Sequence, residues 1–198
     1  MMKPYFDTHS AGVLLLIVLL AWLSMEAIQF ARQWRWRADA TRVGRRSFWL
    51  GFGACLIVTN LALYLGPSAF PAAAIRPGAV AFAAGMVIMV AGVGLRGWSF
   101  YALGRYFTAV IKVSPDQPVV TNGPYRLLRH PSYAGGLLAE VGMAVTAANW
   151  VSVAVFAVAW VAIIAWRIHI EETALLSALG GKYRSYASHH KRLIPLIW

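Results

Sequence analysis

The sequence has little charge, few acidic residues and a single cysteine. Of its 198 residues, 13% are charged and seven are Asp or Glu, whereas about a quarter of an ordinary soluble domain is charged. Cys55 cannot form a disulfide within the chain, and one cysteine cannot supply a metal cluster. His189 and His190 lie in a basic segment without partner ligands, so we expect no metal site. The composition therefore argues against a soluble domain.

Hydrophobic residues, 60% of the chain, gather in long blocks separated by the charged residues. A helix needs about 20 largely apolar residues to cross the roughly 30 Å hydrocarbon core of a bilayer. The fold predicted is an all-α integral membrane protein. Only Ala148 and Asn149 separate the last two apolar blocks, which predicts a tight antiparallel hairpin. We predict five transmembrane helices, at residues 11–30, 48–65, 78–95, 133–147 and 150–168.

The formal net charge of +11 does not indicate nucleic acid, because the basic residues flank the apolar blocks. They concentrate on every second connection, and cytoplasmic loops of membrane proteins carry such an excess. We therefore predict a multi-pass protein with its N-terminus outside and its C-terminus in the cytoplasm, in the inner or plasma membrane if the source is bacterial. The first block is too long for a secretory signal and is interpreted as a permanent span. The basic connections carry Arg32, Arg35, Arg37, Arg42, Arg45 and Arg46, then Arg96, Arg105, Lys112, Arg126 and Arg129, then Arg167, Lys182, Arg184, Lys191 and Arg192.

Two segments are not spans. The polar segment 104–131 is predicted to face the cytoplasm between the third and fourth helices, and the tail from residue 168 to be a helix that breaks at Gly180 and Gly181. We expect a three-helix membrane region at 1–102 and a core that carries the chemistry at 103–198. Close packing between helices is predicted at small residues within the spans, namely Gly51, Gly53, Ala81, Gly85 and Gly92.

A first polar cluster lies where the cytoplasmic segment enters the fourth span. Gly123-Pro124 signals a turn, and the ring of Pro131 pushes His130 toward extended geometry. Arg129, His130 and Tyr133 are thereby brought together. On the residues alone, an anchor to the membrane interface is an equally good interpretation, because basic and tyrosine side chains gather there.

A second polar cluster, residues 167–172, lies at the cytoplasmic end of the fifth span. Arg167 and Glu171 are four residues apart and share a helix face. The simpler interpretation is a salt bridge at the helix end, but it gives no reason for the adjacent Glu171 and Glu172. Ionisable groups at a membrane boundary are costly and often mark a functional site.

Together these clusters resemble the isoprenylcysteine carboxyl methyltransferase family and its relatives, the phospholipid methyltransferases. The resemblance runs from residue 103 to the C-terminus and combines two separated motifs in the same order. The matching residues are Leu103-Gly104, Gly123-Pro124-Tyr125, the run from Arg129 to Gly135, Arg167 with Glu171-Glu172, Leu179-Gly180, Tyr183, Tyr186, and Arg192 before Pro195.

The resemblance implies an enzyme that transfers a methyl group from S-adenosyl-L-methionine, bound between the cytoplasmic segment and the ends of the last two spans. It assigns catalysis to Arg167 and Glu171, with Arg167 also on the substrate side. Lys112 stands where eukaryotic members often have glutamine, although a lysine suits the carboxylate of the cofactor. The residues expected to hold the cofactor are Lys112, Gln117, Pro118, Val119, Val120, Tyr125, His130, Pro131, Ser132, Tyr133 and Glu171.

The chemistry of these residues agrees with that expectation. A glutamate suits the positive groups of the cofactor and basic residues suit its carboxylate, while tyrosine faces attract cations. A carboxylate acceptor is ionised at neutral pH and needs orientation rather than a base, and the fork of Arg167 matches it. An amine acceptor would need a base, with Glu172 or His169 as candidates. Glu140, inside the fourth span, is interpreted as a buried group facing another helix.

We therefore expect a lipophilic, prenylcysteine-like acceptor, a small molecule or a lipidated substrate, which enters from the bilayer. Three alternatives stay open at this point: an N-methyltransferase of phospholipid amines, a membrane reductase using NADPH, such as the sterol reductases, and a non-enzymatic scaffold. The oligomeric state and the roles of Glu172 and Glu140 also stay open.

Overall fold

The computed structural model describes residues 9–35, 45–107, 113 and 116–194. In this part of the chain the long elements are all helices. They are α1 (His9–Arg35), α2 (Arg45–Ala69), α3 (Gly78–Leu103), α4 (Pro131–Thr146), α5 (Trp150–Leu179) and α6 (Gly181–His189), with short 3-10 helices η2 (Pro71–Ala73), η3 (Gly104–Tyr106) and η4 (Gly123–Arg126).

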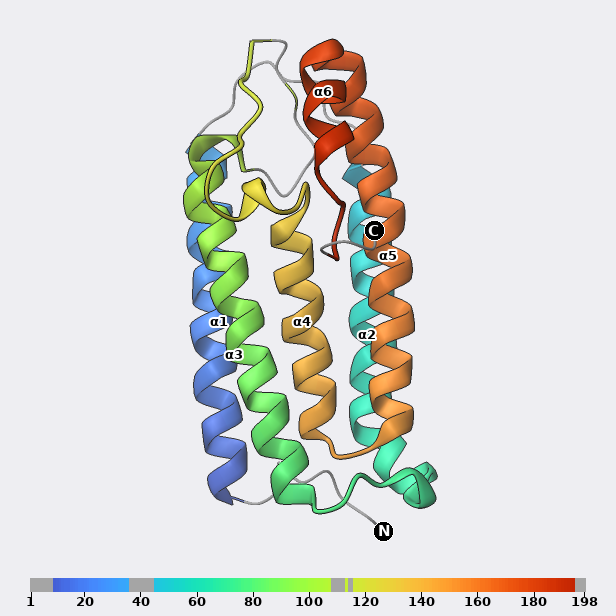
Figure 1. Ribbon diagram of the computed structural model, residues 1–198. Coiled ribbons are helices and arrows are strands. Elements are labelled where there is room, and N and C mark those ends of the chain that lie inside the picture. Colours follow the sequence, from blue (N-terminus) through green and yellow to red (C-terminus); the bar gives the residue numbers. More distant parts are fainter. Residues whose placement is uncertain (1–8, 36–44, 108–112, 114–115, 195–198) are drawn as a thin grey trace.

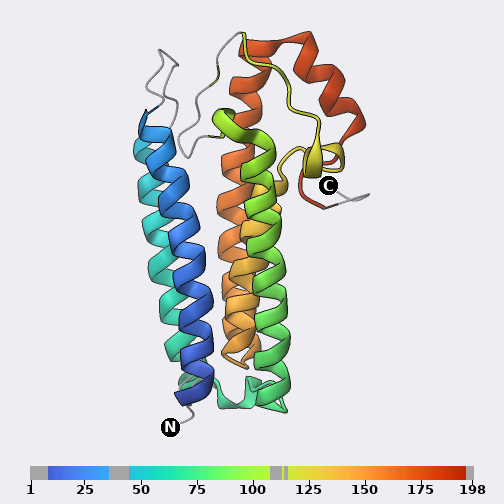
Figure 2. The same cartoon turned by 90° about the vertical axis from the view of Figure 1, so that its left-hand side faces the viewer.

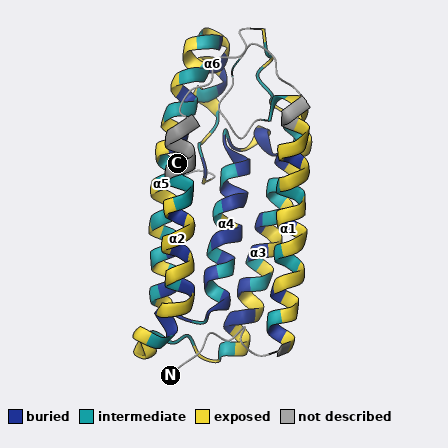
Figure 3. Cartoon of the chain, turned by 180° about the vertical axis from the view of Figure 1, so that it is seen from behind, coloured by how far each residue is buried: buried dark blue, intermediate teal, exposed yellow. Residues whose placement is uncertain are grey.

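Helices α1 to α5 run along one another as a bundle of two layers (Figures 1 and 2). α1 and α2 form one layer, beside α3 and α5 respectively, and α3, α4 and α5 form the other. α6 and the segment that precedes α4 lie together at one end. Figure 3 shows that α4, in the middle, is the most buried helix, whereas α1 and α2 expose much of their apolar surface. This exposure is expected of helices that face lipid.

The prediction of an all-α membrane protein is confirmed. In the described part of the chain, four helices are long and apolar enough to cross a bilayer, and they coincide with the first, second, third and fifth predicted spans. The fourth predicted span corresponds to α4, which has 16 residues and is shorter than the other four. The count of five spans, like the division of the chain at 102/103, stays a prediction.

α3 and α4 pack closely because each presents glycines to the backbone of the other. A Cβ on Gly85 of α3 would lie 2.7 Å from the carbonyl oxygen of Gly142, and one on Gly135 of α4 would lie 2.6 Å from the amide nitrogen of Arg96. Real Cβ atoms essentially never approach this closely. The predicted packing at Gly85 and Gly92 is therefore confirmed. At Gly53 it is wrong, because a Cβ there would meet no described atom within 4 Å.

The predicted hairpin between α4 and α5 is confirmed, and Asn149 builds it. Its side-chain oxygen accepts hydrogen bonds from the amides of Val151 (3.0 Å) and Ser152 (3.2 Å), which caps the first turn of α5. Its side-chain nitrogen donates to the carbonyl oxygen of Phe70 (2.9 Å), beyond the end of α2. One buried amide thus joins the start of α5 to the chain that follows α2, at the end of the bundle opposite α6.

Candidate functional site

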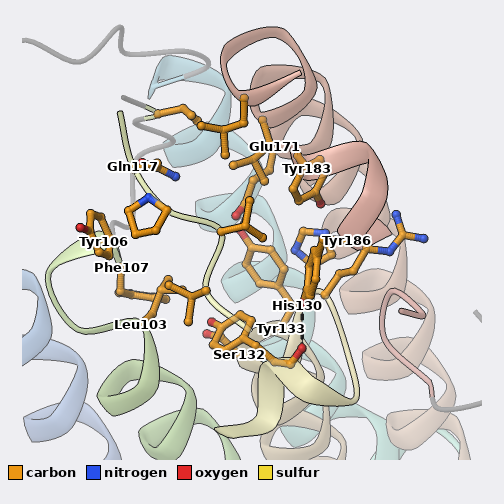
Figure 4. Close-up of a pocket in the computed structure, with 18 residues that line it drawn as sticks. Leu103, Tyr106, Phe107, Gln117, His130, Ser132, Tyr133, Glu171, Tyr183 and Tyr186 are labelled. Carbon is orange, nitrogen blue, oxygen red and sulfur yellow. Dashed lines mark hydrogen bonds between the residues drawn. The ribbon is translucent and has the colours of Figure 1, made fainter. Parts of the chain in front are cut away.

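A cavity opens at the α6 end of the bundle, at the height where α4 begins (Figure 4). It holds about 850 Å³ of empty space, including the part open to solvent. Four segments that lie far apart in the sequence supply its walls: the end of α3 with the following chain, the start of α4, the last turns of α5, and α6. The lining residues are Leu103, Tyr106, Phe107, Val113, Gln117, Pro118, Val119, Val120, Tyr125, Arg129, His130, Ser132, Tyr133, Glu171, Leu175, Leu179, Tyr183 and Tyr186.

Most of the residues predicted to hold a cofactor line this one cavity. The exceptions are Pro131, which is fully buried as the first residue of α4, and Lys112, which lies outside the described residues. Arg167, predicted for catalysis and substrate binding, is buried behind the wall. The two polar clusters of the sequence thus face each other across a shared space.

The hydroxyl of Tyr133 joins the two residues predicted for catalysis. It donates to Oε2 of Glu171 (2.5 Å) and accepts a hydrogen bond from Nε of Arg167 (3.2 Å). The sequence predicted that Arg167 and Glu171 share a face of one helix, and the structure adds a side chain from another helix between them. This arrangement fixes the Glu171 carboxylate at the cavity wall and holds the Arg167 guanidinium directly behind it.

Glu172 has a different role from its neighbour, because consecutive residues of an α-helix point about 100° apart. Its carboxylate is buried among three basic side chains: Arg129 Nη1 at 2.6 Å, His130 Nε2 at 3.3 Å, and Arg192 Nε and Nη2 at 3.0 Å. The sequence left the role of Glu172 open. The structure shows that Glu171 lines the cavity, whereas Glu172 connects α5 to the residues just before α4 and to the C-terminal segment.

The C-terminal segment completes the wall by pairing with the chain just before α4. The amides of Arg129 and His130 donate to the carbonyl oxygens of Lys191 (2.7 Å) and Arg192 (3.0 Å). Nε of Arg129 donates to the carbonyl oxygen of His190 (2.9 Å). These bonds bring residues some 60 positions apart into one layer beside the site.

Three buried tyrosines stabilise this wall. The hydroxyl of Tyr186 lies 2.8 Å from the carbonyl oxygen of Tyr125 and 3.2 Å from that of Leu128, and its ring stacks on His190 at 4.2 Å. Burial raises the pKa of Tyr186, of Tyr183 and of Tyr125, and the nearby Glu171 raises that of Tyr125 further. All three therefore stay neutral and retain the hydroxyl proton at physiological pH.

Several lining residues were absent from the predicted set. Leu103, Tyr183 and Tyr186 had a signal in the sequence, since they belong to the motifs that carry the family resemblance. Tyr106 and Phe107 come from the end of η3 and the residue after it. No feature of the sequence indicated these two rings, because they line the cavity only through the path that the chain takes after α3.

Comparisons with known proteins agree with this geometry. The isoprenylcysteine carboxyl methyltransferase family model matches residues 84–177. Protein-S-isoprenylcysteine O-methyltransferase A of Arabidopsis thaliana is 36% identical over 115 residues, which cover 57% of this chain and 58% of the relative. The Schizosaccharomyces pombe protein-S-isoprenylcysteine O-methyltransferase is 32% identical over 105 residues, 52% of this chain and 44% of the relative. The chain thus spans little more than half the length of the Arabidopsis protein.

A solved structure shows that the likeness extends to the fold. The eukaryotic intramembrane Ras methyltransferase ICMT superposes with a TM-score of 0.60 at 22% identity, over 91% of this chain and 67% of that one. The matched region 84–177 begins within α3 and ends near the end of α5, so it contains both polar clusters that meet at the cavity. Through this region, the chain is similar in sequence to the isoprenylcysteine carboxyl methyltransferase family.

Proposed function

We propose that this protein is a membrane methyltransferase that uses S-adenosyl-L-methionine to methylate a carboxylate of a lipophilic, prenylcysteine-like acceptor. One observation carries the proposal: the segment from His130 to Tyr133 and the end of α5 with Glu171 line a single cavity, with Arg167 bonded directly behind it. Two polar motifs far apart in the sequence thereby form one site at the end of an apolar bundle.

The residues of the cavity fit the cofactor. When bound, S-adenosyl-L-methionine supplies a methyl group activated on a sulfonium cation, which aromatic faces and a carboxylate stabilise. Glu171 provides that carboxylate, and Tyr133 holds it in place. The rings of Tyr106 and Phe107 and the apolar side chain of Leu103 form one wall suited to a flat base. Gln117, with its amide group, comes from the same side.

Arg167 supports a carboxylate as the acceptor. Its guanidinium is buried behind the cavity wall with Nε bonded to the Tyr133 hydroxyl, so it can attract an acceptor carboxylate held beside that hydroxyl without lining the cavity itself. An ionised carboxylate needs no base, and correct alignment of two reactants can supply about 7–11 kcal/mol of a barrier. Of the candidate bases for an amine acceptor, Glu172 is held by three basic side chains and His169 is exposed to solvent. The geometry therefore favours O-methylation over methylation of a phospholipid amine.

The arrangement in the membrane supports a lipophilic acceptor. The cavity lies at one end of a bundle whose outer helices expose apolar side chains. Arg105 lies in η3, Arg126 in η4 and Lys182 in α6, and the chain after α3, the chain before α4 and α6 all lie at this end of the bundle (Figure 1). Because cytoplasmic loops carry an excess of basic residues, we propose that this end faces the cytoplasm, where the cofactor is made, with the N-terminus outside.

A labelling experiment tests the proposal. The full chain in detergent, incubated with methyl-labelled cofactor and N-acetyl-S-farnesylcysteine, is expected to form a product that releases labelled methanol in base, as a methyl ester does. Glu171→Gln and Arg167→Lys should abolish most of this label, whereas His169→Gln on the exposed face of the same helix should retain it. Base-stable label on an amine would overturn O-methylation, and methylation of water-soluble acceptors only would overturn the lipophilic acceptor.

Ligand binding distinguishes a methyltransferase from the two alternatives, a reductase that uses NADPH and a non-enzymatic scaffold. S-adenosylhomocysteine is expected to raise the thermal midpoint of the purified chain, because a ligand that binds only the native state stabilises it. NADPH should not. Stabilisation by NADPH alone would favour a reductase, and no stabilisation by either ligand would favour a scaffold.

A further inference from the structure

A partly buried ion pair connects α1 to the floor of the cavity. Arg96 of α3 binds both carboxylate oxygens of Glu26 on α1, Nε contacting Oε1 and Nη2 lying 3.0 Å from Oε2. The indole nitrogen of Trp22 also donates to Oε1, at 3.2 Å. Only 19% of the Arg96 side chain and 34% of the Glu26 side chain are exposed. The paired carboxylate therefore fixes the orientation of the guanidinium.

The remaining nitrogen of this guanidinium reaches the first turn of α4. Nη1 of Arg96 lies 3.1 Å from the carbonyl oxygen of Ser132 and 3.3 Å from its hydroxyl oxygen. Gly136, one turn further along α4, leaves room for the arginine, because a Cβ there would lie 3.3 Å from Nη1. Ser132 itself is 5% exposed and lines the cavity. A continuous line of contacts thus runs from Glu26 to the site.

The direction of these bonds decides what the Ser132 hydroxyl can do. A serine hydroxyl has one hydrogen to donate and can accept two hydrogen bonds. In this structure its oxygen accepts from the charged guanidinium, which leaves the hydrogen for a different partner. A hydroxyl that accepts from a cation is also polarised into a stronger donor. Arg96 therefore prepares Ser132 to donate to a polar atom in the cavity.

We propose that Glu26 is a positioning residue: through Arg96 it orients Ser132, whose hydroxyl donates a hydrogen bond to the bound cofactor. The inference rests on the proposed function and extends it beyond the family-matched region, since residue 26 precedes residues 84–177. It gives α1 a part in cofactor binding in addition to its apolar packing on α3 through Trp22 and Leu15.

A double-mutant cycle on cofactor affinity tests this coupling without depending on turnover. The dissociation constant of radiolabelled S-adenosylhomocysteine is measured on the full chain in detergent, for the parent, Glu26→Gln, Ser132→Ala and the double variant. We expect Glu26→Gln to weaken binding by about three- to tenfold when Ser132 is present and to have little effect in Ser132→Ala, the behaviour of residues that act through one network. Ser24→Ala is the matched control, because among the described residues this exposed α1 hydroxyl bonds only to Leu20 of its own helix.

Arg96→Lys provides a second measurement. A lysine retains a positive charge for Glu26, but its single compact ammonium group cannot reproduce the planar fork that reaches the carboxylate and Ser132 together. It should weaken cofactor binding as Glu26→Gln does while changing the thermal midpoint less. This variant keeps the test decisive where Glu26→Gln lowers the yield of folded protein.

Each outcome decides one question. Equal weakening by Glu26→Gln with and without the Ser132 hydroxyl would show a purely structural ion pair and overturn the proposal, as would unchanged affinity in both Glu26→Gln and Arg96→Lys. If the parent protein itself does not bind S-adenosylhomocysteine, the proposed function fails first. If the parent binds and the cycle shows no coupling, the positioning role alone is wrong.

Discussion

Replacing Tyr133 with phenylalanine would remove one oxygen atom from the centre of the site. The ring would stay, packed beside His130 with the ring centroids 5.7 Å apart. The bonds to Glu171 (2.5 Å) and from Arg167 (3.2 Å) would be lost. The change therefore separates the hydrogen-bonding role of Tyr133 from its packing.

The expected magnitude follows from the charge of the partners. A hydrogen bond to a charged group contributes about 1.5–3 kcal/mol, and the shorter bond to the Glu171 carboxylate should dominate. We expect a loss toward the lower end of this range, because Glu171 is only half-buried and the cavity opens to solvent. If the lost energy appears in the transition state, kcat/KM should fall about tenfold for each 1.36 kcal/mol.

Thermal unfolding and binding of S-adenosylhomocysteine, both measured in detergent, check this prediction. Tyr183→Phe is the matched control for stability. The Tyr183 hydroxyl is buried in the same cavity wall and has no hydrogen-bond partner among the described residues, so its removal should leave the thermal midpoint unchanged or raise it. An unchanged midpoint and unchanged affinity in Tyr133→Phe would refute the assigned role.

Three further predictions concern stability. Glu172→Gln should lower the thermal midpoint strongly, because breaking a buried ion pair costs about 3–5 kcal/mol; a midpoint near that of the parent would contradict the assigned contacts. Gly92→Ala should reduce the yield of folded protein in size-exclusion chromatography, because its Cβ would clash with the amide nitrogen of Ala139. Gly94→Ala, two residues along the same helix, should not, because a Cβ there would meet no described atom within 4 Å. Equal yields would show that α3 and α4 can move apart. Glu140→Met should raise the thermal midpoint by removing a buried carboxylate oxygen, Oε2, that has no partner among the described residues, since such an oxygen costs about 1–3 kcal/mol; a lower midpoint would reveal a partner.

The helices could be predicted from the sequence because the bilayer imposes a strong pattern. Hydropathy located each long helix, and the helices continue beyond the predicted apolar spans: α3 runs past residue 95 to Leu103, and α5 runs past residue 168 to Leu179, where the sequence had predicted a helical tail. Those last turns are more polar and lie beyond the apolar stretch. The break at Gly180 was predictable, and the positive φ of 55° there suits glycine.

The site could be predicted only as far as its motifs carried information. Two conspicuous polar clusters at one end of the bundle indicated a shared cavity. The separate roles of Glu171 and Glu172 could not be deduced, because they depend on what α4 and the C-terminal segment place against each face of α5. In the same way, Glu26 lies close in sequence to several arginines, yet its partner Arg96 is 70 residues away on α3.

The brevity of α4 has a consequence for where a reaction would take place. At 1.5 Å per residue, its 16 residues span about 24 Å, less than the roughly 30 Å of hydrocarbon in a bilayer. α3 and α5 rise well past its first turn in Figure 1. In a bilayer that all five helices cross, Ser132 and Tyr133 at the start of α4 would therefore lie below the level of the membrane surface. A lipophilic acceptor could then place its polar carboxylate in the cavity while its apolar chain stays in the hydrocarbon of the bilayer.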